Sequence, residues 1–155
     1  MDLAVKDAVN HSPENAAVSP GLPPATVLLV DDDFAMRTIL SFSLLDFGYL
    51  VLCAANGEEA LQIARDHSEI RLIMLDVVMP GLSGTQLAEQ MQIILPESPI
   101  LFCSGHPAST MARYGIDLTS AHFLQKPCSP VELERRVAEL LARGAPNPPA
   151  RAESR

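Results

Sequence analysis

The sequence lacks the features that mark several large classes of protein. It contains no apolar run long enough to span a membrane. Its first residues do not show the basic stretch followed by an apolar one that a secretory signal would have. It has neither a GxGxxG motif nor a phosphate-binding P-loop, which argues against nucleotide binding. We therefore expect no contact with a membrane and no nucleotide cofactor.

Basic residues and paired cysteines are also scarce. The 11 lysines and arginines face 19 acidic residues, the formal net charge is −8, and no basic stripe appears, so DNA or RNA binding is not expected. The three cysteines, Cys53, Cys103 and Cys128, form no CxxC motif, and an odd count without a signal peptide indicates a reducing cytosol. We expect a cytoplasmic protein in which Cys103 and Cys128 are inert thiols.

The length of 155 residues fits one domain with a substantial core. Proline-rich stretches at both ends read as mobile segments. The sequence thus predicts a flexible arm at residues 1–25, a folded domain at 26–143 and a flexible tail at 144–155. No output domain is expected after the folded part, so a stand-alone domain is predicted.

Short apolar runs alternate with helical patterns along the folded part. Strands are expected at 27–30, 49–53, 72–75, 100–103 and 121–125, and helices at 34–47, 56–67, 83–95, 108–114 and 129–143. Five strands that alternate with five helices predict an α/β fold, a doubly wound parallel sheet with the flavodoxin-like strand order 2-1-3-4-5. The first helix is expected to bury Met36, Ile39, Leu40, Phe42, Leu44 and Leu45. The fourth helix is short and weakly apolar, and we expect it to be the least stable element.

Acidic residues follow two of the predicted strands. The run at 72–75 ends at Asp76, and the run at 27–30 ends at Asp31 and Asp32. Because these strands are neighbours in the predicted order, their carboxyl ends meet and the three carboxylates converge. Carboxylates that close repel one another and need a cation to offset their charge. Asp33 is expected to serve only as a helix cap.

These residues belong to a set of short motifs that occurs in order along the chain. The motifs are Val30-Asp31-Asp32, Asp76 with Met79-Pro80-Gly81 and Gly84, Ser104-Gly105, and Lys126-Pro127. In order and approximate spacing the set resembles the receiver domain of a two-component response regulator, over residues 26–143.

The resemblance gives each site residue an expected role. Asp76 is the nucleophile that accepts a phosphoryl group, and Mg²⁺ (or Mn²⁺) bridges the two anionic groups. Asp32 and Asp76 would bind the ion directly, and Asp31 directly or through water; the resemblance adds the backbone carbonyl of Val78. Lys126 supplies a positive charge to a phosphoryl oxygen. The resemblance also implies a cis peptide bond before Pro127.

A switch is implied at two further positions. In the family, the hydroxyl at the position of Ser104 moves toward the phosphoryl group, and an aromatic residue three before the lysine, here Phe123, turns inward. Val78 and His106 stand where the family tunes the lifetime of the phosphoryl group. Because Val78 offers no polar group to orient water, slow self-dephosphorylation is expected.

The function expected from these features is that of a single-domain response regulator, a phosphoacceptor and not an enzyme with a separate substrate. Its expected partners are a histidine kinase, including a hybrid one, or a histidine phosphotransfer protein, together with a downstream protein target. It would be a monomer or a phosphorylation-dependent dimer.

Two alternatives remain open at this point. A haloacid-dehalogenase-like phosphatase also uses an aspartate after a strand, but Ala35 stands where its motif has Thr or Val, and Asp76 would be unexplained. A degenerate receiver would instead bind partners without phosphate.

Overall fold

The computed structural model describes residues 23–143, so most of the predicted arm and all of the predicted tail lie outside the described part of the chain. The elements in chain order are β1 (Thr26–Val30), α2 (Phe34–Asp46), β2 (Leu50–Ala54), α3 (Gly57–Asp66), β3 (Ile70–Asp76), α4 (Gly84–Ile94), β4 (Ile100–Ser104), η2 (Ala108–Tyr114), β5 (His122–Gln125) and α5 (Pro130–Arg143).

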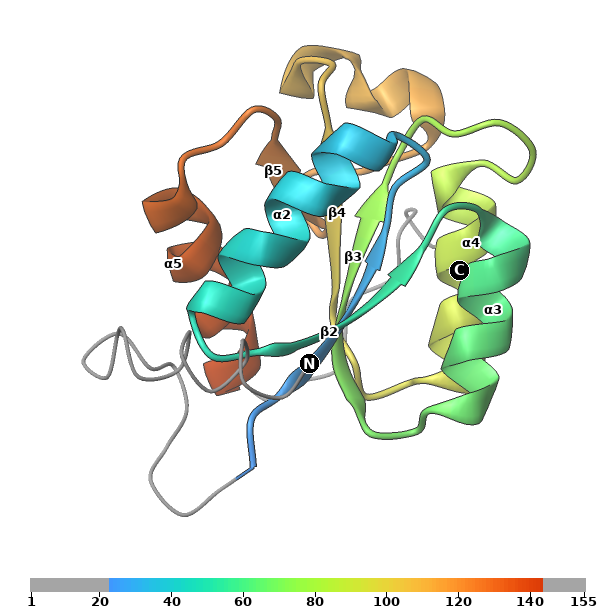
Figure 1. Ribbon diagram of the computed structural model, residues 1–155. Coiled ribbons are helices and arrows are strands. Elements are labelled where there is room, and N and C mark those ends of the chain that lie inside the picture. Colours follow the sequence, from blue (N-terminus) through green and yellow to red (C-terminus); the bar gives the residue numbers. More distant parts are fainter. Residues whose placement is uncertain (1–22, 144–155) are drawn as a thin grey trace.

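The five strands form one parallel sheet in the order β2-β1-β3-β4-β5, which confirms the predicted order. Helices α2 and α5 cover one face of the sheet, and α3 and α4 cover the other (Figure 1). Because β1 and β3 are neighbours in space but not in sequence, the direction of winding changes between them. Such a switch point leaves a crevice at the carboxyl ends of the two strands.

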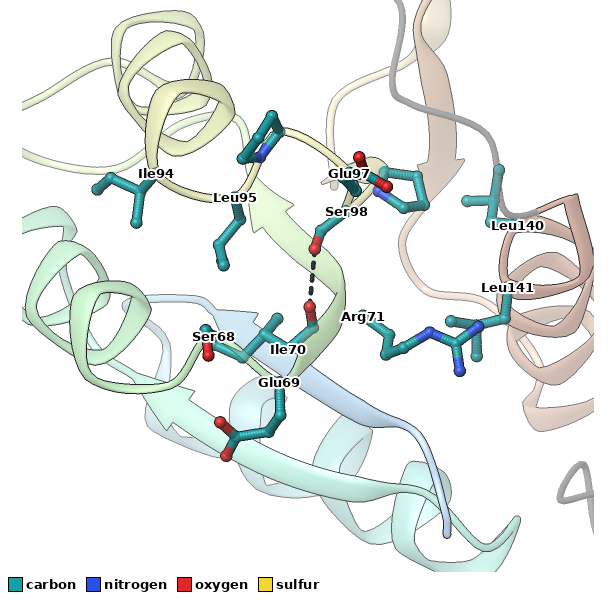
Figure 2. A pocket seen from close by; sticks show the side chains of 12 residues that line it. Ser68, Glu69, Ile70, Arg71, Ile94, Leu95, Glu97, Ser98, Leu140 and Leu141 are labelled. Carbon is teal, nitrogen blue, oxygen red and sulfur yellow. Dashed lines mark hydrogen bonds between the residues drawn. The ribbon is translucent and has the colours of Figure 1, made fainter. Parts of the chain in front are cut away.

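Another hollow lies at the opposite end of the sheet, where β3 begins. It has a volume of about 520 Å³ and lies where β3 begins, beside Arg71 and the last turn of α5 (Figure 2). The hydroxyl of Ser98 donates a hydrogen bond of 2.7 Å to the carbonyl of Ile70 in its wall. None of the site residues predicted from the sequence lines this hollow.

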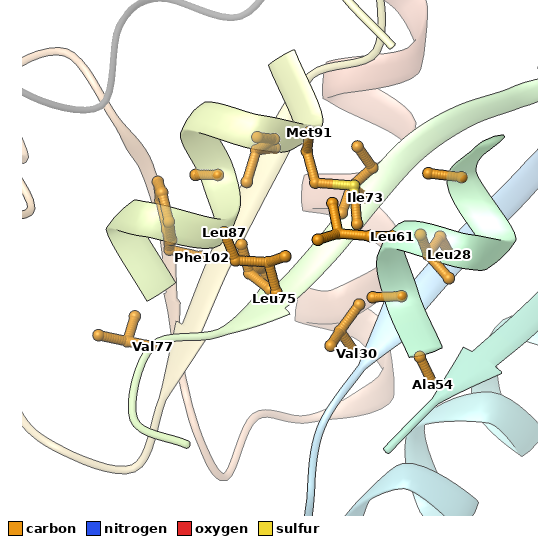
Figure 3. Packing of buried hydrophobic residues seen from close by; sticks show 14 of the residues in the cluster. Leu28, Val30, Ala54, Leu61, Ile73, Leu75, Val77, Leu87, Met91 and Phe102 are labelled. Atoms are coloured by element: carbon orange, nitrogen blue, oxygen red, sulfur yellow. The ribbon is translucent and has the colours of Figure 1, made fainter. Parts of the chain in front are cut away.

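The core is divided in two by the sheet, because successive strand residues point to opposite faces. On β1, Leu28 and Val30 pack toward α3 and α4 (Figure 3), whereas Val27 and Leu29 pack toward α2 and α5. All four side chains are buried. A strand buried on both faces needs an unbroken apolar run, which is the pattern that identified it in the sequence.

Helix α2 corrects part of the predicted core. Leu40 and Leu44, one turn apart, are buried, but the side chains of Ile39 and Phe42 are 59% and 66% exposed. The prediction for these two residues was wrong because a helix that lies on a sheet buries one stripe, and they fall outside the stripe that Leu40 and Leu44 define.

The predicted fourth helix is present as a 3₁₀-helix, η2. No side chain caps its N-terminus, and within it only Met111 is buried. A 3₁₀-helix has poorer hydrogen-bond geometry than an α-helix. Its low stability relative to the other elements remains a prediction.

Gly84 fixes the start of α4 close to the end of β3. Ser83 and Gln86 form a capping box there, and the Gly84 N–H donates to the carbonyl of Val77 at 3.2 Å. A Cβ atom on Gly84 would lie 2.9 Å from that carbonyl oxygen. Only glycine therefore allows the helix to approach the residue that follows Asp76.

Among residues 23–143, no helix combines the length and the apolar character that crossing a membrane would require.

We predict that Gly84→Ala destabilises the fold by about 1–3 kcal/mol, because the new methyl group must displace backbone rather than a flexible side chain. Gly105→Ala is the matched control: a Cβ there meets no atom within 4 Å, and the change should stay within about 1 kcal/mol of wild type. Urea unfolding of both variants measures the difference. Equal stability of the two variants would show that the close approach is not needed.

Candidate functional site

Four strands deliver the predicted site residues to one edge of the sheet. Asp31 directly follows β1, Asp76 ends β3, Ser104 ends β4 and Lys126 directly follows β5. Parallel strands end on the same side, so residues up to 95 positions apart in the chain become neighbours. They surround a hollow of about 480 Å³ at the switch point, which is also lined by Val78, Gly105 and His106.

Three carboxylates form the floor of this hollow. One oxygen from each of Asp31, Asp32 and Asp76 can be chosen so that all three lie within 4.8 Å of one another. Asp31 is 1% exposed and Asp76 is 7% exposed, whereas Asp32 faces solvent. Hard oxygen ligands of this kind, with an open side for water, suit Mg²⁺. The donor set therefore fits the predicted ion.

Lys126 neutralises part of this charge. Its Nζ atom lies 2.8 Å from Oδ2 of Asp31 and 3.6 Å from Oδ1 of Asp76. Burial tends to lower the pKa of Lys126, but the hydrogen bond to Asp31 and the charges of both carboxylates outweigh it, so the pKa is raised. The peptide bond between Lys126 and Pro127 is cis, as the resemblance implied.

Asp31 and Asp76 differ in how firmly their oxygens are held. Oδ1 of Asp31 accepts the N–H of Asp33 at 2.9 Å, and Oδ2 accepts the Lys126 ammonium at 2.8 Å. Asp76 has a longer contact of 3.6 Å between its Oδ1 atom and Lys126, and it also accepts a backbone hydrogen bond from Val78. Lys126 therefore holds Asp31 more closely than Asp76.

Burial gives Asp76 an unusual protonation equilibrium. It raises the pKa of Asp76 from the ordinary value of 3.8 to about 6; the Lys126 ammonium opposes the rise and the Asp31 carboxylate adds to it. A cation at the site would favour the ionised form and lower this pKa again.

Ser104 lies against the acids but is held by its own loop. Its side chain is fully buried, and its Oγ atom accepts the N–H of His106 at 2.9 Å. A fully buried hydroxyl needs a partner. In that bond the hydroxyl is the acceptor, so the bond does not use the hydroxyl hydrogen that the predicted role as a phosphoryl ligand requires.

Phe123 lies within β5, three residues before Lys126. It is half-buried, is paired in register with Phe102 of β4, and packs against the core beneath α3 and α4. Its backbone carbonyl accepts a hydrogen bond of 2.8 Å from Arg136 of α5. The switch role of Phe123 stays a prediction.

Sequence reasoning missed two residues of helix α2 at this site. Arg37 donates from Nη1 to the carbonyl of Asp31 at 2.6 Å, and Met36 lines the hollow. A signal for both existed, because Asp33 caps α2, as predicted, through the N–H of Met36. The cap places the first turn of the helix beside the acids.

The cysteines show no sign of reactivity. Cys103 is buried at the end of β4, and burial raises the pKa of its thiol far above the ordinary value. Burial also raises the pKa of Cys128 and of Cys53. All three thiols are free.

Comparison with known proteins gives one consistent family. Residues 27–138 match the sequence model of the response regulator receiver domain. The chain is 40% identical over 119 residues to the probable transcriptional regulator ycf27 of Cyanidium caldarium, and 34% identical over 117 residues to the alkaline phosphatase synthesis transcriptional regulatory protein PhoP of Bacillus subtilis. These alignments cover 76% of this chain but only 46% and 48% of the relatives, so the chain spans about half their length.

Solved structures agree with the sequence comparison. The chemotaxis protein CheY4 of Vibrio cholerae superposes with a TM-score of 0.67 at 29% identity, over 76% of this chain and 98% of that one. The receiver domain of the hybrid histidine kinase CckA superposes with a TM-score of 0.65 at 35% identity, over 76% of this chain and 99% of that one.

The raised pKa of Asp76 predicts a stability effect with a definite sign. The Asp76 carboxyl group binds its proton more tightly in the folded state than in the unfolded state. The folded state therefore becomes less stable as the pH rises from about 4 through about 6. Without a divalent cation, Asp76→Asn should therefore stabilise the protein at pH 7.5 by roughly 1–3 kcal/mol, and by less at pH 5. Urea unfolding in EDTA at both pH values measures this.

Asp33→Asn is the matched control for that measurement. It removes one negative charge from the same edge of the sheet, but Asp33 is exposed and asparagine caps a helix equally well. An equal gain in stability in Asp76→Asn and Asp33→Asn would mean that general charge repulsion, and not the burial of Asp76, causes the gain.

Proposed function

Because this chain belongs to the family of response regulator receiver domains, we propose that it accepts a phosphoryl group on Asp76 and thereby changes its binding to a partner protein. The difference between the two buried aspartates is the observation that carries this assignment. Lys126 forms a 2.8 Å hydrogen bond with Asp31, whose other oxygen accepts the Asp33 N–H, whereas its contact with Asp76 is longer, at 3.6 Å, and Asp76 otherwise accepts a backbone hydrogen bond from Val78.

The proposed reaction is a displacement at phosphorus. An oxygen of Asp76 forms the new bond to phosphorus, while the bond from phosphorus to the donor, such as the imidazole of a phosphohistidine, breaks and its electron pair leaves with the donor. Asp31, Asp32, Asp76 and the carbonyl of Val78 would hold Mg²⁺. When bound, that ion offsets the negative charge of the carboxylates and the phosphoryl oxygens.

Two side chains then bind the new anion. The Lys126 ammonium, now 2.8 Å from Asp31, turns to a phosphoryl oxygen, and Asp31 would then serve as one of the ligands of the ion. The Ser104 hydroxyl, whose oxygen accepts the His106 N–H, donates its own hydrogen to another phosphoryl oxygen.

The partners follow from the same proposal. The phosphoryl donor is a histidine kinase, including a hybrid one, or a histidine phosphotransfer protein, and the output is a change in binding to a downstream protein. Residues 26–143 form the functional unit, and the protein acts in the cytoplasm. It catalyses its own phosphoryl transfer and dephosphorylation but turns over no separate substrate.

A phosphatase that uses Asp31 as nucleophile is not retained. Asp31 is 1% exposed, and its two oxygens are engaged by the Asp33 N–H and by Lys126, so neither is available to attack phosphorus. The match to the receiver family over residues 27–138 also leaves this reading without support.

Asp76 as phosphoacceptor is tested by intact mass. After incubation with acetyl phosphate and Mg²⁺, wild type should gain one phosphoryl group, and Asp76→Asn or added EDTA should abolish the gain. Asp33→Asn serves as the control, because Asp33 lines the same hollow but binds no ion in this proposal. A gain that persists in Asp76→Asn would move the nucleophile to Asp31 or Asp32. No gain in wild type would favour a degenerate receiver.

The lifetime of the phosphoryl group gives a second test. Val78 lines the hollow and is 39% exposed, but its side chain cannot orient an attacking water. We predict that Val78→Asn speeds the loss of the phosphoryl group by roughly tenfold, which equals about 1.4 kcal/mol of barrier. Decay of the phosphorylated mass after the donor is removed measures the rate.

The control for this comparison is Val131→Asn. Val131 is 75% exposed at the start of α5 and does not line the hollow, so its replacement should leave the decay rate unchanged. An unchanged rate in Val78→Asn as well would show that this side chain does not limit the access of water.

A further inference from the structure

Asp32 is the exposed member of the acid cluster, and the chain around it determines where its carboxylate points. It stands in the short connection between β1 and α2, after the buried Asp31 and before the helix cap Asp33. Its side chain faces solvent, so packing does little to hold it. The direction of the carboxylate therefore depends on how firmly the backbone on both sides of Asp32 is fixed.

Arg37 of α2 bonds to the backbone on both sides of Asp32. Its guanidinium donates from Nη1 to the carbonyl of Asp31 at 2.6 Å, and its backbone N–H donates to the carbonyl of Asp33 at 2.9 Å. The first bond supplies a charged donor just beyond Val30, the last residue of β1 that is paired with a neighbouring strand. One residue of the helix thus fixes the segment that carries Asp32.

The guanidinium of Arg37 is itself held in place by Phe34. Its Cζ atom lies 5.5 Å from the centroid of the Phe34 ring, a position in which the face of the ring attracts a positive charge. Phe34 is 73% exposed, so packing in the core does not account for an aromatic residue there. The contact with Arg37 gives this exposed ring a role at the site.

The charge of Arg37 alone would have the opposite effect on a cation. A guanidinium beside the carboxylates repels a divalent ion, so its removal would tighten ion binding if charge were its one contribution. If Arg37 instead fixes Asp32, its removal loosens a ligand and weakens binding. The two contributions also differ in their response to salt, because added ions screen the repulsion between charges but do not restore a lost hydrogen bond.

We propose that Arg37 is a positioning residue for the divalent-cation site. It fixes the backbone on both sides of Asp32, so that an oxygen of this carboxylate stays within 4.8 Å of oxygens of Asp31 and Asp76, and Phe34 holds the guanidinium in that arrangement. The inference rests on the proposed function, which makes Asp32 a ligand of the ion. Arg37 contacts neither the ion nor the phosphoryl group and acts through Asp32.

Binding of Mn²⁺ tests this role without any phosphoryl transfer. Mn²⁺ takes the same oxygen ligands as Mg²⁺, and electron paramagnetic resonance measures the free ion directly. Arg37→Met keeps an unbranched side chain that neither donates a hydrogen bond nor carries a charge, and it should raise the dissociation constant about tenfold at both low and high ionic strength. Phe34→Leu leaves the charge of Arg37 in place and should raise the dissociation constant about twofold.

Arg113→Met is the matched control for the loss of charge. Arg113 lies on η2, is exposed and does not line the hollow, so the change removes one positive charge without touching the segment of Asp32. Its dissociation constant for Mn²⁺ should equal that of the wild type at high ionic strength. Urea unfolding in EDTA shows which variants are folded, and if Arg37→Met is not, the exposed Phe34→Leu carries the test.

The rate of phosphoryl uptake separates positioning of the ion ligand from general damage to the site. In Arg37→Met, uptake from acetyl phosphate should be slower than in the wild type when Mg²⁺ is limiting. It should return to the wild-type rate when Mg²⁺ is saturating, because a loosely held ligand lowers the affinity for the ion and not what the bound ion supplies.

Three results would overturn the role of Arg37 alone: Mn²⁺ binding in Arg37→Met that is as tight as in the wild type or tighter, an equal weakening in Arg113→Met at high ionic strength, or uptake in Arg37→Met that stays slow in saturating Mg²⁺. In each case phosphoryl uptake by the wild type leaves Asp76 as acceptor intact. The expected pattern of Mn²⁺ binding without phosphoryl uptake by the wild type would overturn the proposed function and uphold the role of Arg37. If the wild type binds no Mn²⁺, the ion site fails, and the role of Arg37 fails with it.

Discussion

The ion pair between Lys126 and Asp31 is the contact on which the rest of the site depends. The fold buries two carboxylates at the switch point, Asp31 at 1% exposure and Asp76 at 7%. Burying one charge without a partner is costly, and two like charges add their repulsion. The Lys126 ammonium forms a hydrogen bond of 2.8 Å with Asp31 but only a longer contact of 3.6 Å with Asp76. Burial, to which the Asp31 carboxylate adds, explains why the pKa of Asp76 is raised to about 6, and the three neighbouring carboxylates explain why the site fits a divalent cation.

The same sheet that creates this electrostatic strain also limits how the site can relieve it. The parallel ladder between β1 and β3 is regular and buried from Val27–Leu72 to Val30–Leu75, directly before the two aspartates, so the backbone holds these aspartates close together. Relief must come from groups on mobile side chains or from outside the protein. Lys126 has a flexible stem and can change partners, and a cation or a phosphoryl group can enter the open hollow of about 480 Å³.

Much of this arrangement could be predicted from the sequence, because it depends on where strands end. Apolar runs that stop at Asp31, Asp76, Ser104 and Lys126 place those residues at one edge once the strands are known to be parallel. Features that depend on the packing of helices could not be predicted in this way. The exposure of Ile39 and Phe42 follows from how α2 lies on the sheet. The contacts of Arg37 with Asp31, and of Tyr114 with His106, depend on the path of loops and first turns, which have no hydrophobic period.

Ser104 and Lys126 illustrate how such a site can have two states without any large rearrangement of its core. The Lys126 ammonium already donates to Asp31, whereas the Ser104 hydroxyl accepts the His106 N–H and does not use its own hydrogen in that bond. A new anion on Asp76 would compete with Asp31 for the ammonium and would offer an acceptor to the Ser104 O–H, and hydrogen bonds to an ionised acceptor are roughly twice as strong as neutral ones. A conformational change needs such a difference in interaction energy between the two states. Under the proposed phosphorylation, these two side chains can respond to the new anion while the strands stay in place.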